Sequence, residues 1–95
     1  SKTTTTIFLA NVKNTKNEII QISKRLRDAG INNECDIMNR DLRKQLEYVN
    51  AKGIPYVIVI GPKETKSNKA KLRNMETGEE KEVSLENIGE IKKAL

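Results

Sequence analysis

Amide, basic and acidic side chains gather in three short polar segments of the sequence. They are Asn11, Lys13, Asn14, Asn39, Arg40, Lys63, Glu64, Lys66 and Asn68, with Lys44 and Gln45 close behind the second segment. Amide and guanidinium groups hydrogen-bond the exposed edges of nucleic-acid bases beside a phosphate backbone, and they suit proton transfer poorly. The pattern therefore favours nucleic-acid binding. The alternative is that these segments are polar only because loops are solvated.

Glu64 is the one acid in the basic stretch from Lys63 to Arg73. A carboxylate accepts hydrogen bonds from the amino and imino groups of guanine or from the amino group of cytosine, which a lysine cannot do. Glu64 is therefore a candidate for reading a base. The alternative is a surface charge paired with Lys63 or Lys66.

Catalytic chemistry has little support in this sequence. There is no histidine and a single cysteine, so no Ser-His or Cys-His dyad, internal disulfide or thiol-based zinc site can form. We expect Cys35 to be a packing thiol in a reducing compartment, and Asp36 with Asp41 to make at most a weak metal site. The glycines match no dinucleotide or phosphate-binding motif, so we expect no cofactor.

Aromatic residues make up 3% of the chain, namely Phe8, Tyr48 and Tyr56. Phe8 and Tyr56 fall in apolar runs, which leaves Tyr48 as the candidate for stacking on a base.

Charge is distributed unevenly along the chain. The net charge is +5, but residues 39–73 carry nine basic and three acidic side chains, whereas residues 74–95 carry three basic and six acidic ones. This asymmetry favours a polyanionic partner that contacts the middle of the chain. The alternative is a solvated surface of mixed charge.

The length of 95 residues, with 36% hydrophobic and 33% charged residues, fits one soluble domain covering residues 1–95. The longest apolar run, Ile54–Ile60, is far shorter than the roughly 20 residues of a membrane span, and Ser1–Thr6 is too polar for a signal peptide. We expect a cytoplasmic protein without a membrane partner.

Hydrophobic spacing predicts alternating strands and helices in the first half of the chain. The apolar run 7–12 indicates a strand buried on both faces. Thr15 and Glu18 have the spacing of a capping box, and the helix after it, with Ile19, Ile22, Leu26 and Ala29 on its buried face, ends at Gly30. Alternation from 33 to 37, with Cys35 and Ile37 on one face, predicts a strand near an edge.

The second half continues with a helix from Asn39 or Asp41 to Gly53, which buries Leu42, Leu46 and Val49. Residues 56–60 form the strongest strand signal. A hairpin of strands at 69–73 and 81–83 turns at Thr77-Gly78, and Ser84 is expected to cap a last helix with an apolar stripe of Leu85, Ile88, Ile91 and Leu95.

The predicted fold is a three-layer α/β/α domain of order βαβαβββα, with a five-stranded mixed sheet and three helices. Right-handed crossovers put the first strand between the second and third. Ligands of such sheets bind beyond the carboxyl ends of the strands. We therefore expect Asn11–Thr15, Met38–Asp41 and Gly61–Asn68 to meet at one rim.

The sequence also resembles the anticodon-binding domain of class IIa aminoacyl-tRNA synthetases over nearly its whole length. The resemblance is carried by Leu26–Ile31, Asp36, Leu42–Tyr48, Gly53–Gly61 and Lys63-Glu64. Met75–Glu80 leading into Val83–Leu85 is most similar to the histidyl members, with the prolyl and threonyl members next.

This resemblance implies a five-stranded mixed sheet and several site residues. Glu64 falls where members of the family contact anticodon bases, Asn39 and Arg40 fall in a segment that approaches the same bases, and Lys44-Gln45 match a Lys-Gln pair of the family. The sequence departs from the family pattern at Arg43 and at residues 66–69, which leaves the identity of the recognised bases open.

The resulting expectation is the C-terminal anticodon-recognition module of a larger, dimeric synthetase resembling histidine–tRNA ligase, whose catalytic domain is separate. Its partners are then the tRNA anticodon stem-loop, the catalytic domain and, through the parent, a second copy. The predicted RNA-binding residues are Asn11, Asn14, Asn39, Arg40, Lys44, Gln45, Glu64 and Lys66. The alternatives are a regulatory or accessory protein-interaction or dimerisation module, and a small enzyme for which no catalytic pair is found.

Overall fold

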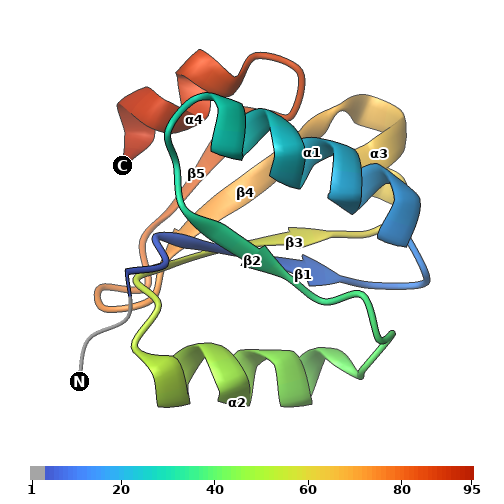
Figure 1. The fold of residues 1–95 in the computed structure, drawn as a ribbon, viewed down its shortest axis with the longest axis vertical. Coiled ribbons are helices and arrows are strands. Elements are labelled where there is room, and N and C mark those ends of the chain that lie inside the picture. Colours follow the sequence, from blue (N-terminus) through green and yellow to red (C-terminus); the bar gives the residue numbers. More distant parts are fainter. Residues whose placement is uncertain (1–3) are drawn as a thin grey trace.

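The computed structural model describes residues 4–95, so Ser1–Thr3 of the polar Ser1–Thr6 segment lie outside the described residues. Five strands and four helices follow one another along this part of the chain (Figure 1). They are β1 (Ile7–Asn11), α1 (Lys16–Asp28), β2 (Asn33–Cys35), α2 (Leu42–Lys52), β3 (Tyr56–Ile60), α3 (Pro62–Ser67), β4 (Lys69–Asn74), β5 (Glu80–Ser84) and α4 (Ile88–Ala94).

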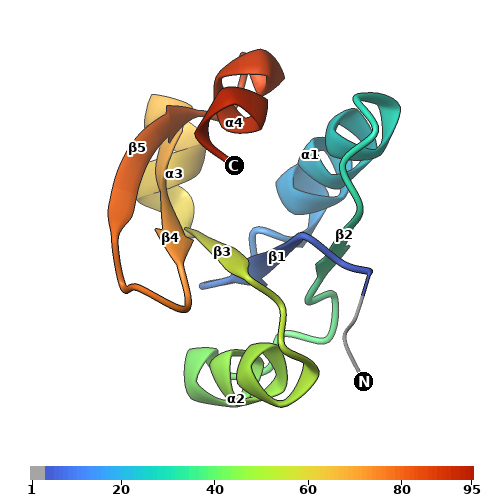
Figure 2. The same cartoon turned by 90° about the vertical axis from the view of Figure 1, so that its left-hand side faces the viewer.

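The predicted five-stranded mixed sheet is confirmed, with strand order β2-β1-β3-β4-β5. β1 pairs in parallel with β2 and β3, as expected from two right-handed crossovers, whereas β4 is antiparallel to both β3 and β5. In Figure 2, α1 and α4 cover one face of the sheet and α2 lies against the other. The layered α/β/α arrangement therefore follows the prediction.

Each face of the sheet has its own core, because alternate strand residues point to opposite sides. The larger core joins Leu9 and Ile58 of the sheet to residues of α1 and α4, and the smaller one joins Phe8 and Val57 to Val49 of α2. Beyond these two cores, the α2 side of β4 and β5 carries exposed charged side chains. That part of the sheet face is open to solvent.

The prediction of three helices was incomplete, because the expected loop between Gly61 and Asn68 contains α3. Pro62 occupies the first helical turn, where its missing N–H costs nothing, and Glu64 Oε1 accepts a hydrogen bond from the Gly61 N–H at 2.8 Å. Asn68 ends the helix in the left-handed conformation, with φ of 55°. Pro62 followed by Glu64 is a spacing typical of a helix start, so this helix could have been predicted.

Two predicted helix caps were wrong. Thr15 precedes α1, but its hydroxyl makes no capping bond to the helix and instead lies 2.8 Å from both Asn11 Oδ1 and the Ile60 carbonyl. Ser84 ends β5, and its hydroxyl accepts from the Glu86 and Asn87 amides in a turn before α4. In both places the hydroxyl that the local spacing predicted as a helix cap bonds other groups instead.

The predicted strand at 33–37 ends early, at Cys35. The chain turns there, so Asp36 is buried at 5% exposure while Ile37 is 50% exposed, the reverse of the predicted alternation. Leu42 at the start of α2 is also exposed, at 36%, although its spacing predicted burial.

Tyr48 joins α2 to the chain around β2. Its ring packs against Phe8 with centroids 5.7 Å apart, and its hydroxyl donates to Glu34 Oε1. The Thr5 hydroxyl donates to the other oxygen of the same carboxylate at 2.5 Å. Donation from Thr5 and then Tyr48 lowers the pKa of Glu34 from its ordinary 4.5. Tyr48, which the sequence suggested for stacking on a base, is thus engaged in packing within the protein.

We predict that Tyr48→Phe lowers the free energy of unfolding by about 0.5–1.5 kcal/mol at neutral pH, because a carboxylate loses a donor. A lowered folded-state pKa stabilises the fold above 4.5, and that contribution is lost as pH falls through the folded value. The difference between wild type and variant should therefore shrink at pH 3. Urea unfolding at both pH values measures it, with Tyr56→Phe as the control. A difference that is equal at both pH values would contradict the assigned bond.

Candidate nucleic-acid interface

The three predicted rim segments lie at one end of the sheet. Asn11 ends β1 opposite Ile60, the last residue of β3, and the β2 register closes with Leu9 opposite Cys35. Since these three strands are parallel, the segments that follow them leave from the same edge (Figure 1). The structure therefore brings together the chain segments that the topology argument placed there.

Gln45 occupies the place of a neighbouring strand beside the end of β1. The β2 register stops at Cys35, and beyond it Gln45 Oε1 accepts from the Asn11 N–H while Gln45 Nε2 donates to the Asn11 carbonyl, both at 2.8 Å. Nε2 also donates to the Arg40 carbonyl at 2.7 Å. Gln45 is 1% exposed, so these bonds satisfy its amide in the interior.

The Asn11 side chain connects two of the rim segments. Its Oδ1 accepts from the Thr15 amide at 2.7 Å and lies 2.8 Å from the Thr15 hydroxyl, and its Nδ2 donates to Asn39 Oδ1 at 2.7 Å. Asn11 is 3% exposed. Asn11 and Gln45 therefore face inward and hold the rim together, and neither presents its amide to solvent.

The segment from Asp36 to Asp41 is held by its own carboxylates. Asp36 accepts from the Met38 and Arg40 amides at 3.4 and 3.1 Å, and Asp41 caps α2 by accepting from the Lys44 amide at 2.8 Å. These bonds fix the backbone and leave Met38 and Arg40 exposed. Because the backbone is already fixed, a ligand that binds here would have to order only the exposed side chains.

Backbone strain is concentrated in the same three segments. Among residues 4–95, the non-glycine residues with positive φ are Lys13, Asn14, Asn39 and Asn68, with values between 54° and 58°. Asparagine tolerates this conformation, but Lys13 carries a steric cost of about 1 kcal/mol. Strained residues persist where surrounding bonds over-determine them, and they are frequent at functional sites.

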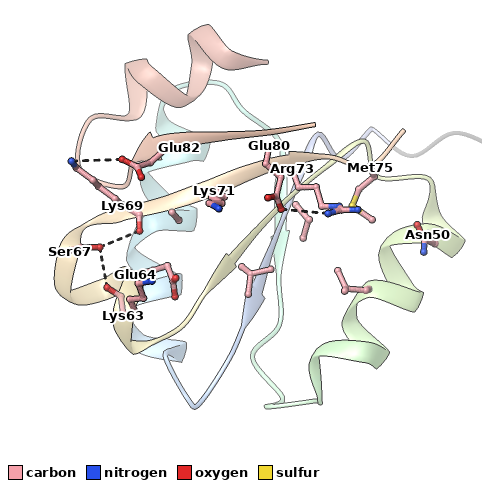
Figure 3. A pocket seen from close by; sticks show the side chains of 14 residues that line it. Asn50, Lys63, Glu64, Ser67, Lys69, Lys71, Arg73, Met75, Glu80 and Glu82 are labelled. Carbon is pink, nitrogen blue, oxygen red and sulfur yellow. Dashed lines mark hydrogen bonds and ion pairs between the residues drawn. The ribbon is translucent and has the colours of Figure 1, made fainter. Parts of the chain in front are cut away.

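A groove of about 890 Å³ lies beside the rim, on the open part of the sheet face (Figure 3). Leu46 and Asn50 of α2 line it on one side and Lys63, Glu64 and Ser67 of α3 on another. Val57, Val59 and Met75 form its apolar floor, and Ala70 also lines it. Its charged wall consists of Lys69, Lys71 and Arg73 of β4 and Glu80 and Glu82 of β5. Glu64 is half-buried here.

The predicted site residues divide between this groove and a second hollow. Glu64 lines the groove, whereas Arg40 and Gln45 line a hollow of about 250 Å³ with Tyr48 and Met38. Asn14, Asn39, Lys44 and Lys66 are exposed around them. Both hollows border α2, which separates them. The ion pairs among residues 4–95 do not include Glu64, so pairing with Lys63 or Lys66 is not observed.

Sequence reasoning missed Asn50, Lys71, Arg73 and Met75 as residues of the groove. The alternation of β4, with Ala70 and Leu72 buried, already placed Lys71 and Arg73 on the opposite face. What the sequence did not say is that α2 leaves that face uncovered. This depends on where α2 packs, which is a tertiary property.

Neither a reactive thiol nor a metal site is found among the described residues. Burial raises the pKa of the Cys35 thiol, which favours its protonated form. Within residues 4–95, no group of three His, Cys, Asp or Glu side chains could hold a metal ion. In the same range, no helix combines the length and apolarity that crossing a membrane requires.

An α/β domain with a rigid polar rim, exposed cations around it and a groove of mixed donors and acceptors has the character of a binding module. The family model described as "Anticodon binding domain" matches residues 6–95. The chain belongs to that family.

Individual relatives agree with this assignment. The chain is 44% identical over 85 residues to a histidine–tRNA ligase of Methanococcus maripaludis and 38% identical over 86 residues to that of Clostridium novyi, covering 86% and 90% of this chain. The histidyl-tRNA synthetase structure from Nostoc sp. superposes with a TM-score of 0.85 at 28% identity over 97% of this chain and 22% of that one. The chain spans about a fifth of the length of the curated relatives it matches, 20% and 21% for these two.

We predict that Gln45→Leu lowers the free energy of unfolding by about 2–4 kcal/mol, because the buried peptide groups of Asn11 and the carbonyl of Arg40 lose their partners. Gln21→Leu, at an exposed position of α1, is the matched control and should change stability by less than about 0.5 kcal/mol. Urea unfolding of both variants measures the effect. A Gln45→Leu loss as small as the control's would show that the rim does not depend on this amide.

Proposed function

We propose that this chain is the anticodon-binding domain of a histidine–tRNA ligase and that it binds the anticodon stem-loop of tRNA. The proposal is supported most by the family match over residues 6–95 together with a rim held rigid by Asn11 and Gln45. In the parent ligase, its partners are a separate catalytic domain and, through the parent, a second copy. The proposed compartment is the cytoplasm.

The proposed contacts fall into two kinds. Exposed lysines around the rim, Lys44 at the start of α2 and Lys66 on α3, contact phosphates. Glu64, Asn39 and Arg40, with Asn14, present acceptors and donors to unpaired bases. Asn11 and Gln45 act as positioning residues, because their amides are buried and bonded inside the protein.

Glu64 is suited to base recognition because only part of its carboxylate is engaged. Oε1 caps α3 through the Gly61 N–H, which fixes the side chain over the groove. The carboxylate can then accept from an amino group of guanine or cytosine without first being ordered. This reasoning makes Glu64 a specificity residue and the surrounding lysines affinity residues.

We predict that Glu64→Gln weakens binding of the preferred anticodon stem-loop by about 1–3 kcal/mol and changes the base preference. Glutamine keeps an oxygen for the Gly61 N–H, so the helix cap survives while one acceptor becomes a donor. Fluorescence anisotropy with stem-loops that differ at single anticodon positions measures the preference.

Lys66→Ala is the matched comparison on the same helix, α3. It should weaken all stem-loops to a similar degree and reduce the slope of log affinity against log salt by about one. Equal affinity of the unaltered protein for all anticodon sequences would contradict the proposed function.

A further inference from the structure

The charged wall of the groove is a ladder of opposite charges across β4 and β5. Lys71 lies directly opposite Glu82 and Arg73 directly opposite Glu80 in the antiparallel register. Arg73 NH1 is 3.5 Å from Glu80 Oε2, and Lys69 Nζ is 3.9 Å from Glu82 Oε1 (Figure 3). Two of the three cations of β4 are therefore paired with carboxylates of β5.

The basic and acidic segments that are separate along the sequence lie next to each other in the fold. Residues 39–73 are strongly basic, but folding places the acidic strand of residues 80–84 against their last part. The groove lining holds four cations, Lys63, Lys69, Lys71 and Arg73, against three carboxylates, Glu64, Glu80 and Glu82. The groove is thus nearly neutral although the chain carries +5 overall.

These ion pairs are largely exposed to solvent, so their contribution to folding stability does not explain their presence. Their side chains are 64% and 65% exposed for Lys69 with Glu82, and 47% and 41% for Arg73 with Glu80. Such pairs contribute little to folding, since water and salt screen them. Their larger effect is on the electrostatic potential that an approaching polyanion meets.

Building on the proposed function, we propose that Glu80 and Glu82 are specificity determinants that exclude phosphate from the groove. Their carboxylates repel a nucleic-acid backbone and hold Lys69 and Arg73 in neutral pairs. A nucleobase, which is uncharged and carries both donors and acceptors, meets no such repulsion over the apolar floor of Val57 and Val59. The two acids thereby reduce sequence-independent binding, which depends on phosphate contacts, more than they reduce binding of the correct loop. Discrimination against a wrong ligand by repulsion is an established route to specificity.

The test compares Glu80→Gln/Glu82→Gln with Asp28→Asn/Glu86→Gln in the full chain. Both double variants raise the net charge by the same amount, but Asp28 and Glu86 are exposed residues that do not line the groove. Circular dichroism and thermal melting check that both remain folded. The probes are oligouridylate, a stem-loop with the histidine anticodon and the same stem-loop with a scrambled anticodon, each titrated at several salt concentrations.

We expect the groove variant to bind oligouridylate roughly fivefold more tightly than the control variant at low salt, with a salt dependence steeper by about 0.7 for each additional phosphate that it binds. Its preference for the histidine anticodon over the scrambled one should fall. Equal oligouridylate affinity and slope in the two variants would overturn the proposal, because net charge alone would then account for the tighter binding. A wild-type protein that does not discriminate between the two stem-loops contradicts the proposed function, and the oligouridylate comparison still decides the role of the two acids.

Discussion

The polar rim of this domain depends on a buried side-chain amide that bonds the end of β1 where a neighbouring strand would otherwise pair. Where β2 turns away from β1, Gln45 of α2 bonds the N–H and the carbonyl of Asn11 and also the Arg40 carbonyl. Without Gln45, the N–H and the carbonyl of Asn11 would be buried without partners, at a cost of about 1–3 kcal/mol each. Because Asn11 in turn bonds Thr15 and Asn39, the linked hydrogen bonds of Gln45 and Asn11 fix the end of β1, the start of α1 and the loop before α2.

In our proposal, the consequence is a division between residues that build the interface and residues that face a ligand. The Asn11 and Gln45 amides and the Asp36 carboxylate bond groups inside the protein, and together they fix the rim. Arg40, Lys44 and Lys66 lie exposed around it. The groove beside this frame has a different character, with an apolar floor and charges of both signs. In our proposal Lys44 and Lys66 contact phosphates, whereas Arg40 and the groove with Glu64 contact bases, so affinity and specificity reside in neighbouring but separate parts of the surface.

The sequence predicted the sheet well because apolar runs and crossover handedness constrain it strongly, and it placed the three polar segments at one edge correctly. It failed where a side chain had a choice of partners. Thr15 and Ser84 had cap spacing but bonded elsewhere, and Asn11 and Gln45 were interpreted as solvent-facing although they are buried. For Gln45 a signal existed, since it lies four residues before Val49, on the face of α2 that packs against the sheet. The groove could not be foreseen, because it depends on how far α2 extends over the sheet.

Mapping of backbone amide shifts by NMR, with the uniformly labelled chain titrated by a histidine anticodon stem-loop, would show which surface of the domain receives the RNA. We expect the shifts to gather at Met38–Asp41, at Lys63–Lys66 and on the groove face of β4, while α1 beyond its first turn and α4 stay unchanged. Shifts concentrated on α1 and α4, or none at concentrations where the stem-loop is bound, would contradict binding at the rim and groove.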